Sequence, residues 1–503
     1  MRIGLIYDIS HKLSLFVRRV DYIRIRQNGK EKKGLFHPGI YGFHSPGVTY
    51  NYPIISYMET EMPQATFHFP TGFLWGTATA AHQVEGNNTN NNWSAWEEQP
   101  GRILHGQHAG LACDWWGGRW REDFDRAAET GQNAHRLSIE WSRIQPAADR
   151  WDENALDHYR EMLRGLMQRN ITPLVTLHHF TDPLWLTEMG GWENDQVVDL
   201  FAAYVRKAVS ALKEYASLWV TINEPNVYTY SGYIEGTFPP GKKDLSAAYR
   251  VMRNLLRGHA EAYRVIHQVQ PTARVGTAIN FRGFQPARPG FPPDRWIANF
   301  LSGNFNESFL NPMQTGRFRF AMRGEALPGV RNTQDFVGVN YYTTDLVTFA
   351  PLKARDFFFT HRYPEDAEQS MNGFIANVPL GLYHKLEWAT RFKLPIMITE
   401  NGVEDADDSM RPRYTLEHIY QVWRGINFNW PIKGYFHWSL VDNFEWERGW
   451  TQRFGLWGLE LETQRRIRRP SVDLYAEICK SNAIAYETVA RYTPELLPKL
   501  FPG

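Results

Sequence analysis

Residues 218–224 read LWVTINE, and residues 395–401 read PIMITEN. Each stretch is a short apolar run, typical of a buried strand, that carries a glutamate at or next to its end. A carboxylate at the end of an apolar strand is costly unless something there needs the charge. If both strands are parallel members of one barrel, Glu224 and Glu400 point into the same mouth. The prediction of the fold therefore depends on whether strands of this kind recur along the chain.

Strands of this kind do recur, and helical patterns lie between them. The eight β-type runs are residues 73–80, 134–139, 172–179, 218–224, 273–280, 335–342, 395–401 and 433–440. They are continuously apolar, as expected for strands covered on both faces. The helical patterns are residues 154–170, 195–216, 245–270, 379–393, 414–429 and 471–487. The alternation predicts an α/β fold, a single (β/α)₈ TIM barrel whose active site lies at the carboxyl ends of its strands.

The domain organisation follows from where this pattern starts and stops. Residues 1–62 mix basic, Gly, Pro and Tyr residues without a sustained period, so we expect a poorly ordered or non-catalytic N-terminal extension. Residues 63–487 form the predicted (β/α)₈ catalytic domain, and residues 488–503 a C-terminal tail. The extension is expected to carry no chemistry.

Composition limits the classes of function. The chain has 503 residues and a net charge of +1, which offers no electrostatic case for nucleic acid or an anionic membrane. No apolar stretch approaches the roughly 18 residues that span a bilayer. Its two cysteines, Cys113 and Cys479, exclude a disulfide scaffold but leave one bridge open. We expect a cytoplasmic protein; its oligomeric state stays open.

Polar side chains gather at the predicted strand ends. They are Gln83, Arg136, His179, Asn223, Glu224, Asn340, Tyr342, Glu400, Trp438, Glu445 and Trp446. Amide, imidazole, phenol, carboxylate and indole groups on one rim favour a neutral ligand with many hydroxyl groups. A metal would need a tighter His and carboxylate cluster, so we expect no metal and no cofactor. Two facing carboxyl groups in such a site are the minimum equipment for cleaving a glycosidic bond.

Aromatic residues also follow the strands, and their faces can stack on the apolar C–H faces of sugar rings. The set comprises Phe180, Tyr341, Tyr342, Trp438, Trp446 and Trp450. We expect these residues to form a sugar-binding platform, and the other aromatic residues to pack in the core.

Seven motifs resemble glycoside hydrolase family 1, the β-glucosidase and β-galactosidase family. They occur in the family's order, from about residue 67 to about residue 481. They are FLWGTATA (73–80) leading to QVEG (83–86), HRLSIEWSRI (135–144), TLHHF (176–180), TINEPN (221–226), GVNYY (338–342), TENG (399–402) and HWSLVDNFEW (437–446). One such motif is weak evidence; seven in order make chance agreement implausible.

The resemblance implies a retaining mechanism with two displacements. Glu400 matches the nucleophile and Glu224 the acid/base. Arg136 and the Tyr342 hydroxyl would flank Glu400 and favour its ionised form. Glu224, desolvated and near that charge, would have a raised pKa and start protonated. The implied activity is hydrolysis of terminal non-reducing β-D-glucosyl residues, with β-D-galactosyl or fucosyl residues as further substrates.

The resemblance also implies how the terminal sugar is held. Its hydroxyl partners would be Gln83, His179, Asn223 and Glu445, with Trp438 as the stacking floor, Trp446 beside Glu445, and Asn340 near Tyr342. This chain departs from the family at Phe180, where many members have Trp, and at Phe374-Ile375, before Pro379. The aglycone side is therefore expected to differ in shape.

Two alternatives remain. A 6-phospho-β-glycosidase of the same family would have Ser in place of Glu445, whose charge repels a phosphate. A non-catalytic sugar-binding barrel would usually lack one of the two glutamates, and this chain has both. The partner expected in either case is a small β-glycoside or an oligosaccharide.

Overall fold

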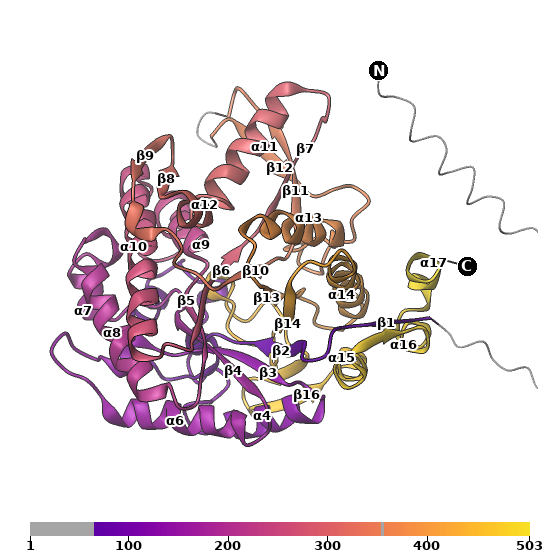
Figure 1. Ribbon diagram of the computed structural model, residues 1–503, viewed down its shortest axis with the longest axis horizontal. Helices are drawn as coiled ribbons and strands as arrows, with labels where there is room; N and C mark the ends of the chain where they lie inside the picture. Colours follow the sequence, from indigo (N-terminus) through magenta and orange to yellow (C-terminus); the bar gives the residue numbers. More distant parts are fainter. Residues whose placement is uncertain (1–64, 354–356, 503) are drawn as a thin grey trace, which may run out of the picture. The chain divides into compact units, whose positions relative to one another are not determined.

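The barrel is the centre of the computed structural model, which describes residues 65–353 and 357–502. Eight parallel strands close on themselves (Figure 1). In chain order they are β2 (Leu74–Ala78), β3 (Ala134–Ser138), β4 (Thr172–His178), β5 (Leu218–Asn223), β6 (Arg274–Asn280), β10 (Phe336–Asn340), β13 (Ile396–Asn401) and β14 (Ile432–Trp438). The last strand pairs with the first, from Gly434 opposite Leu74 to Trp438 opposite Ala78. The predicted (β/α)₈ barrel is confirmed.

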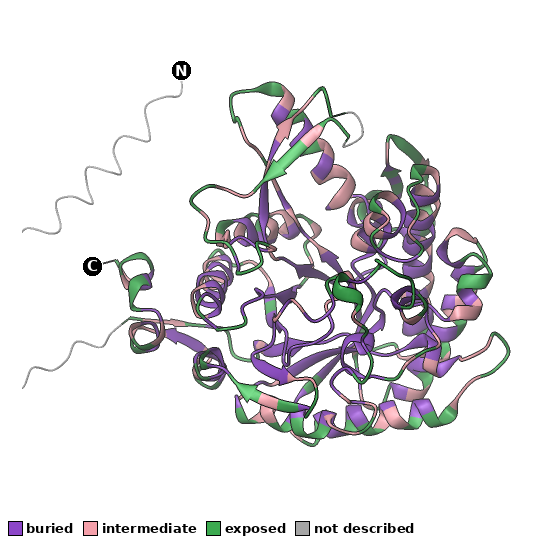
Figure 2. Cartoon of the chain, turned by 180° about the vertical axis from the view of Figure 1, so that it is seen from behind, coloured by how far each residue is buried: buried purple, intermediate pink, exposed green. Residues whose placement is uncertain are grey.

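Helices connect successive strands and surround the barrel. The longer ones are α4 (Trp120–Glu129), α6 (Glu153–Met167), α8 (Val197–Leu212), α10 (Leu245–Val269), α11 (Pro292–Phe305), α13 (Pro379–Ala389), α14 (Arg411–Asn427) and α15 (Pro470–Ser481). In α8, Val197, Phe201, Tyr204, Val205, Ala208 and Leu212 are buried, the face that the sequence spacing predicts. The barrel strands are mostly buried, with a few exposed residues near their starts, such as Thr172, Arg274 and Lys433, whereas the helices carry exposed residues on their outer sides (Figure 2).

Side-chain caps fix where two of these helices begin. Asp152 accepts hydrogen bonds from the backbone of Asn154 and Ala155 at the start of α6. Asp244 accepts from Ser246 and Ala247 at the start of α10. These contacts satisfy amides that have no partner within the helix.

Shorter helices lie between these elements along the chain. They are α2 (Ala81–Val84), α3 (Asn92–Glu97), α5 (Trp141–Ile144), α7 (Leu184–Glu188), α9 (Pro225–Tyr230) and α12 (Leu310–Thr315). Two hairpins also lie outside the barrel: β8 (Arg317–Phe320) with β9 (Arg323–Ala326), and β15 (Trp457–Glu460) with β16 (Arg465–Arg468).

A three-stranded sheet beside α11 projects from the barrel, at the top of Figure 1. Its strands are β7 (Gly283–Pro286), β11 (Thr344–Phe349) and β12 (Phe359–Arg362). A small hydrophobic core of its own holds this sheet against α11. It contains Ile297, Ala298, Leu301 and Val347, with Phe284 and Phe359 packed against it. We call α11, β7, β11 and β12 the projecting element.

The predicted strands and helices agree with the structure within a few residues, with one exception. The helix predicted over residues 471–487 is wrong, because the chain leaves α15 at Asn482 in the left-handed conformation (φ 52°). The Asn482 side chain accepts a hydrogen bond from Trp75 Nε1 (2.8 Å) and donates to the Phe69 carbonyl (2.9 Å). Those bonds hold a turn from which β17 (Ala483–Ala485) pairs with β1 (Thr66–His68).

The C-terminal residues continue into two short helices, α16 (Tyr486–Tyr492) and α17 (Leu497–Leu500). Residue 488, where we expected a tail to begin, lies inside α16. The Phe501 ring stacks on Phe67 with 4.4 Å between centroids, next to β1. The predicted extension over residues 1–62 lies outside the described residues.

Both cysteines are free and buried. Within the described ranges, no helix combines the length and the apolar character needed to cross a membrane.

Candidate active site

A cavity of about 530 Å³ lies at the carboxyl ends of the barrel strands. Seven of the eleven predicted site residues line it: His179, Glu224, Tyr342, Glu400, Trp438, Glu445 and Trp446. The other four, Gln83, Arg136, Asn223 and Asn340, lie in a buried layer behind them and bind them through hydrogen bonds. The structure therefore brings all the predicted residues into one site.

Glu400 is the second-last residue of β13 and lies between two hydrogen-bond donors. The guanidinium of Arg136, from β3, donates to Oε1 at 2.5 Å, and the Tyr342 hydroxyl donates to Oε2 at 2.6 Å. Arg136 and Glu400 are almost fully buried, so little water screens their attraction. Burial raises the pKa of Glu400, while Arg136 and Tyr342 oppose that rise by stabilising the carboxylate.

Glu224 follows β5 in a different environment. The amides of Asn340 and Asn280 both donate to its Oε1, at 2.8 and 3.0 Å. No side chain of the described ranges donates to Oε2. Burial, and then the negative charge of Glu400, raise the pKa of Glu224 to about 8. One carboxyl group is therefore suited to hold a proton at neutral pH, and the other lies beside a permanent cation.

The backbone of Glu224 is unusual. The residue immediately precedes α9 and has φ 43° and ψ 57°, in the left-handed region that non-glycine residues avoid. Such conformations cluster at functional sites because they aim a side chain where an ordinary strand end would not. Here Glu224 lines the cavity, at the junction of β5 and α9.

Asn223 and His179 complete the buried layer around Arg136. Arg136 Nη2 donates to Asn223 Oδ1 at 2.6 Å, and the Asn223 amide lies 2.9 Å from His179 Nε2. An amide nitrogen only donates, so His179 Nε2 is the acceptor and Nδ1 carries the proton of a neutral ring. That buried Nδ1 has no partner among the described residues. It is a donor available to a ligand.

Gln83 and Glu445 are joined by a hydrogen bond, and Glu445 lines the cavity. Gln83 Nε2 donates to the Phe444 carbonyl (2.7 Å), to Asn443 Oδ1 (3.1 Å) and to Glu445 Oε2 (3.3 Å). Its Oε1 is buried with no partner in the described ranges. Burial, and then the charge of Glu447, raise the pKa of Glu445 well above its usual value. Unpaired buried acceptors of this kind need hydroxyl donors from a ligand.

The predicted aromatic platform is right in part. Trp438 and Trp446 line the cavity, and the His179 ring stacks on both, with centroids 6.2 and 5.9 Å away. Phe180 and Tyr342 also line it. Two further predictions are wrong, because Tyr341 and Trp450 lie outside the lining. Tyr341 points away from the cavity, with its hydroxyl donating to the Val378 carbonyl at 2.7 Å. Trp450 Nε1 donates to the His108 carbonyl at 2.9 Å.

Asn280 is a site residue that the sequence reasoning missed. It ends β6 and donates to Glu224 Oε1, as Asn340 does from β10. The signal was present: Asn280 is the polar residue at the end of the fifth predicted strand. The rule that found the other strand-end residues would have included it.

Known proteins resemble this chain over most of its length. The family model for glycosyl hydrolase family 1 matches residues 65–484. The chain belongs to glycosyl hydrolase family 1. It is a glycoside hydrolase of the β-glucosidase type, as the resemblance predicted.

This family 1 enzyme matches curated relatives over almost the whole length of those relatives. A 1,4-beta-D-glucan glucohydrolase of Thermotoga neapolitana is 35% identical over 449 residues, covering 83% of this chain and 99% of the relative. A beta-galactosidase of Sulfolobus acidocaldarius is 30% identical over 484 residues, covering 83% of this chain and 96% of the relative.

Solved structures of the family superpose well. The family 1 β-glucosidase of Thermotoga maritima gives a TM-score of 0.79 at 33% identity, covering 83% of this chain and 99% of that one. A β-glycosidase of Pyrococcus horikoshii gives 0.79 at 36% identity, covering 85% and 98%. The Thermotoga maritima enzyme has also been solved in complex with glucoimidazole.

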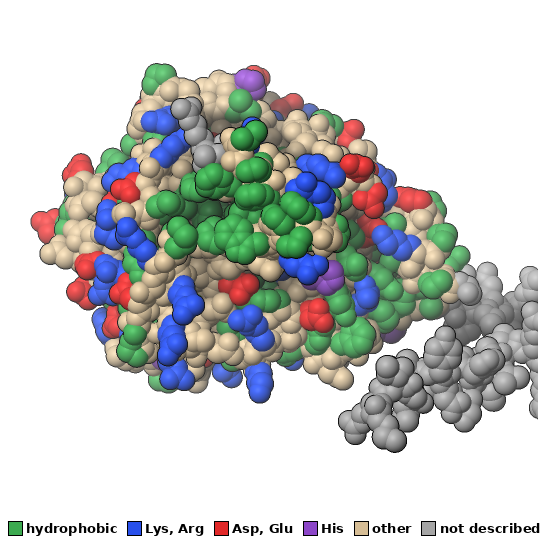
Figure 3. Space-filling model, turned by 90° about the horizontal axis from the view of Figure 1, so that it is seen from above, with side chains coloured by type: hydrophobic (Ala, Val, Ile, Leu, Met, Phe, Trp, Pro, Cys, Tyr) green, Lys and Arg blue, Asp and Glu red, His purple; other side chains and the backbone are tan. Residues whose placement is uncertain are grey.

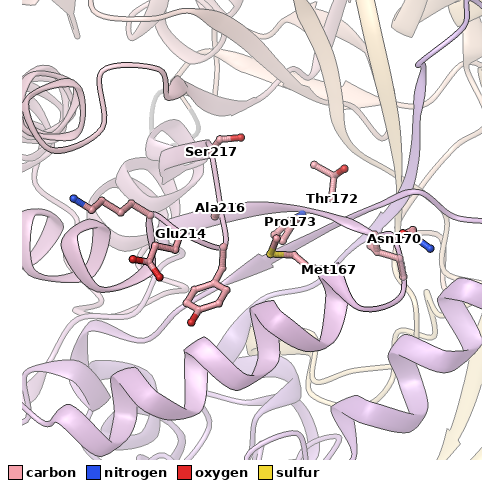
Figure 4. A pocket seen from close by; sticks show the side chains of 10 residues that line it. Met167, Asn170, Thr172, Pro173, Glu214, Ala216 and Ser217 are labelled. Carbon is pink, nitrogen blue, oxygen red and sulfur yellow. The ribbon is translucent and has the colours of Figure 1, made fainter.

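A second hollow of this family 1 barrel lies at the opposite end, beside the starts of β4 and β5 (Figure 4). Its lining includes Met167, Thr172, Pro173 and Ser217, and Glu214 is the single carboxylate among its ten lining residues. With no facing carboxyl group, this hollow cannot perform the same chemistry.

Proposed function

We infer that this family 1 enzyme is a retaining exo-β-glycosidase. It removes terminal non-reducing β-D-glucosyl residues, and also β-D-galactosyl or fucosyl residues, through a covalent glycosyl-enzyme. The observation that carries the proposal is the difference between the two glutamates. Glu400 is paired with Arg136 and Tyr342, whereas Glu224 accepts only amide hydrogen bonds and has a pKa of about 8.

In the first step, Glu400 attacks the anomeric carbon while Glu224 gives its proton to the glycosidic oxygen. The bond from the anomeric carbon to that oxygen breaks, a bond to a Glu400 oxygen forms, and the aglycone leaves as an alcohol. The proton comes from Oε2 of Glu224, since Oε1 is occupied by the two asparagine amides.

In the second step, the esterified Glu400 carries no charge, so the pKa of Glu224 falls. Glu224 then takes a proton from water, which attacks the anomeric carbon and releases the sugar. Two inversions at one carbon give net retention.

The terminal sugar lies against Trp438, with hydroxyl groups facing Gln83, His179 and Glu445. Gln83 Oε1 accepts from the sugar and His179 Nδ1 donates to it, which removes the two unpaired buried atoms from the site. Relatives named beta-glucosidase and beta-galactosidase, and the solved complex with glucoimidazole, support a monosaccharide unit in this position.

The test is turnover of 4-nitrophenyl β-D-glucoside by the purified protein and by Glu400→Ala. We expect turnover by the native enzyme only, and proton NMR should show β-glucose as the first product. First appearance of α-glucose would contradict retention, and equal rates for the two proteins would contradict the role of Glu400. A panel with galactoside, fucoside and 6-phosphoglucoside defines the sugar; preference for the phosphorylated substrate would overturn the assignment of Glu445.

A further inference from the structure

The cavity has an outer half that the two displacements do not use. The proton donor lies beside the oxygen of the leaving group, so side chains next to Glu224 on the mouth side face the aglycone. These come from α9, which begins directly after Glu224, and from the projecting element. Val227 and Tyr230 of α9 line the cavity together with Phe284, Leu301, Phe305 and Phe359 of that element. The inference below rests on the proposed function.

The lining residues form a connected aromatic wall. The rings of Tyr230 and Phe305 meet edge to face with 5.0 Å between centroids, and Phe305 meets Phe284 in the same way at 6.0 Å. Leu301 belongs to the core of the projecting element, and Phe284 and Phe359 pack against that core. The wall is therefore held in place before a ligand arrives, which lowers the entropic cost of binding.

Hydrophobic side chains surround a hollow on the face seen from above (Figure 3). That view looks from the side on which the projecting element lies in Figure 1.

Two arginines of the outer half, Arg282 and Arg448, are paired with carboxylates. Arg282 donates to Asp345 through Nε at 2.5 Å and through Nη2 at 3.0 Å. Arg448 Nε lies 3.2 Å from Glu447 Oε1. The Tyr363 hydroxyl donates to the Phe374 carbonyl at 2.5 Å. The donor atoms named here therefore already have partners within the protein.

A second sugar ring in this half would bury several hydroxyl groups against phenyl rings. Each hydroxyl that leaves water without a partner costs about 1–3 kcal/mol. The polar side chains Glu235, Thr237 and His361 also line the cavity, and they are exposed at its rim. An alkyl or aryl group has no such requirement and gains about 25 cal/mol for each Å² it buries.

We propose that the aglycone of this enzyme is an apolar alcohol, alkyl or aromatic, and that Tyr230, Phe284, Leu301, Phe305 and Phe359 select it over a second sugar. The leaving group is released as that alcohol, protonated by Glu224. The specificity comes from the projecting element and α9, whereas the chemistry comes from the barrel strands.

The first experiment compares kcat/KM of the native enzyme for octyl β-D-glucoside and for cellobiose. Octyl glucoside should be preferred by about tenfold or more, since its chain covers the wall and cellobiose leaves hydroxyl groups unpaired. Cellobiose preferred over octyl glucoside would overturn the proposal.

The second experiment uses Phe284→Ser and Phe305→Ser, with β-D-glucosyl fluoride as a substrate that has no aglycone ring. Each variant should lower kcat/KM for octyl glucoside about tenfold and leave the value for the fluoride within about twofold. Phe300→Ser is the matched control, because Phe300 lies on the same helix, stacks on Trp296 at 5.7 Å and does not line the cavity. Equal losses on both substrates would contradict a role in aglycone selection.

A binding measurement separates failure of this proposal from failure of the proposed function. Octyl 1-thio-β-D-glucoside, which resists hydrolysis, should bind Glu400→Ala at least about tenfold more tightly than methyl 1-thio-β-D-glucoside, as measured by calorimetry. That result would support the apolar subsite even if no substrate were turned over. Equal affinities would refute the subsite even in an active β-glucosidase.

Discussion

The inner and outer halves of the cavity are built on opposite principles. In the inner half, Arg136, Asn223, Asn340 and Glu400 are almost fully buried and linked by hydrogen bonds of 2.5–3.1 Å. In the outer half, phenyl rings line the wall, and Arg282 and Arg448 form ion pairs with Asp345 and Glu447. The inner half comes from strands that close the barrel, and the outer half from elements added around it.

The difference teaches that chemistry and selectivity are separable in this molecule. A change in the inner half should affect every substrate, since each one presents the same sugar and the same anomeric carbon. A change in the outer half should affect only substrates whose aglycone reaches it. In the proposed mechanism Glu224 stands at the border, because it gives its proton to the oxygen that joins the two parts.

Glu224→Ala should have the largest leaving-group dependence. Octyl glucoside needs the proton and should lose about 10²–10⁴-fold in kcat, whereas 2,4-dinitrophenyl glucoside should retain its first step. With azide present, the variant should yield the β-glycosyl azide. Glu214→Ala, from the hollow at the other end of the barrel, is the control and should behave as the native enzyme. An α-glycosyl azide would contradict the assigned role.

Glu445→Gln should lower kcat/KM for all substrates to a similar extent. In the proposed function Glu445 binds the sugar and not the aglycone, so kcat/KM should fall about 10²-fold for octyl glucoside and for glucosyl fluoride. Glu447→Gln removes a neighbouring carboxylate that pairs with Arg448 in the outer half, and should leave the fluoride unchanged. If both variants lower kcat/KM for the same substrates, the proposed division between the two halves of the cavity is wrong.

Tyr342→Phe tests the surroundings of Glu400. Loss of the 2.6 Å hydrogen bond destabilises the carboxylate, so the pKa of Glu400 rises and the acidic limb of kcat/KM moves to higher pH. The rate should fall about tenfold at its optimum. Tyr341→Phe is the matched control, because the neighbouring hydroxyl points away from the cavity. An acidic limb at an unchanged pH would argue against the assigned contact.

The pH profile of the native enzyme should reflect the pKa of Glu224. Glu224 must be protonated to act as an acid, and burial together with the charge of Glu400 raises its pKa to about 8. Activity should therefore be present below that pH and fall about tenfold per unit above it. The basic limb should disappear in Glu224→Ala with the dinitrophenyl substrate. Its persistence would assign the limb to another group.

Removal of residues 1–64 should have the smallest effect. The residues that form both halves of the cavity lie after residue 64. We expect kcat/KM for both octyl glucoside and glucosyl fluoride to stay within about twofold of the full chain. An insoluble or inactive truncated protein would show that the extension belongs to the catalytic unit.

The sequence predicted the inner half better than the outer half for physical reasons. Barrel strands are continuous apolar runs, and a polar residue at the end of such a run, such as Glu400 or Asn223, has few structural explanations. β7, β11 and β12 carry mixed patterns of only four to six residues, which are common in loops. No local pattern indicated that Phe284 and Phe305 would meet.

Errors in the prediction have the same origin. Tyr341 and Tyr342 are neighbours in the sequence, and only the fold decides which ring faces the cavity. Asn482 ends a helix that periodicity alone extends to residue 487, because the turn is stabilised by Trp75 and Phe69, far away in the chain. Tertiary contacts of this kind are absent from any local pattern.

The left-handed backbone at Glu224 has a consequence for the thermal stability of this protein. Glycine adopts φ 43° without strain, whereas a residue with a side chain pays about 1–3 kcal/mol there. A Glu224→Gly variant should therefore melt at a higher temperature than the native enzyme while losing its proton donor. Selection for thermal resistance alone would replace that glutamate. Its presence therefore indicates that some stability of the folded state is given up for catalytic activity.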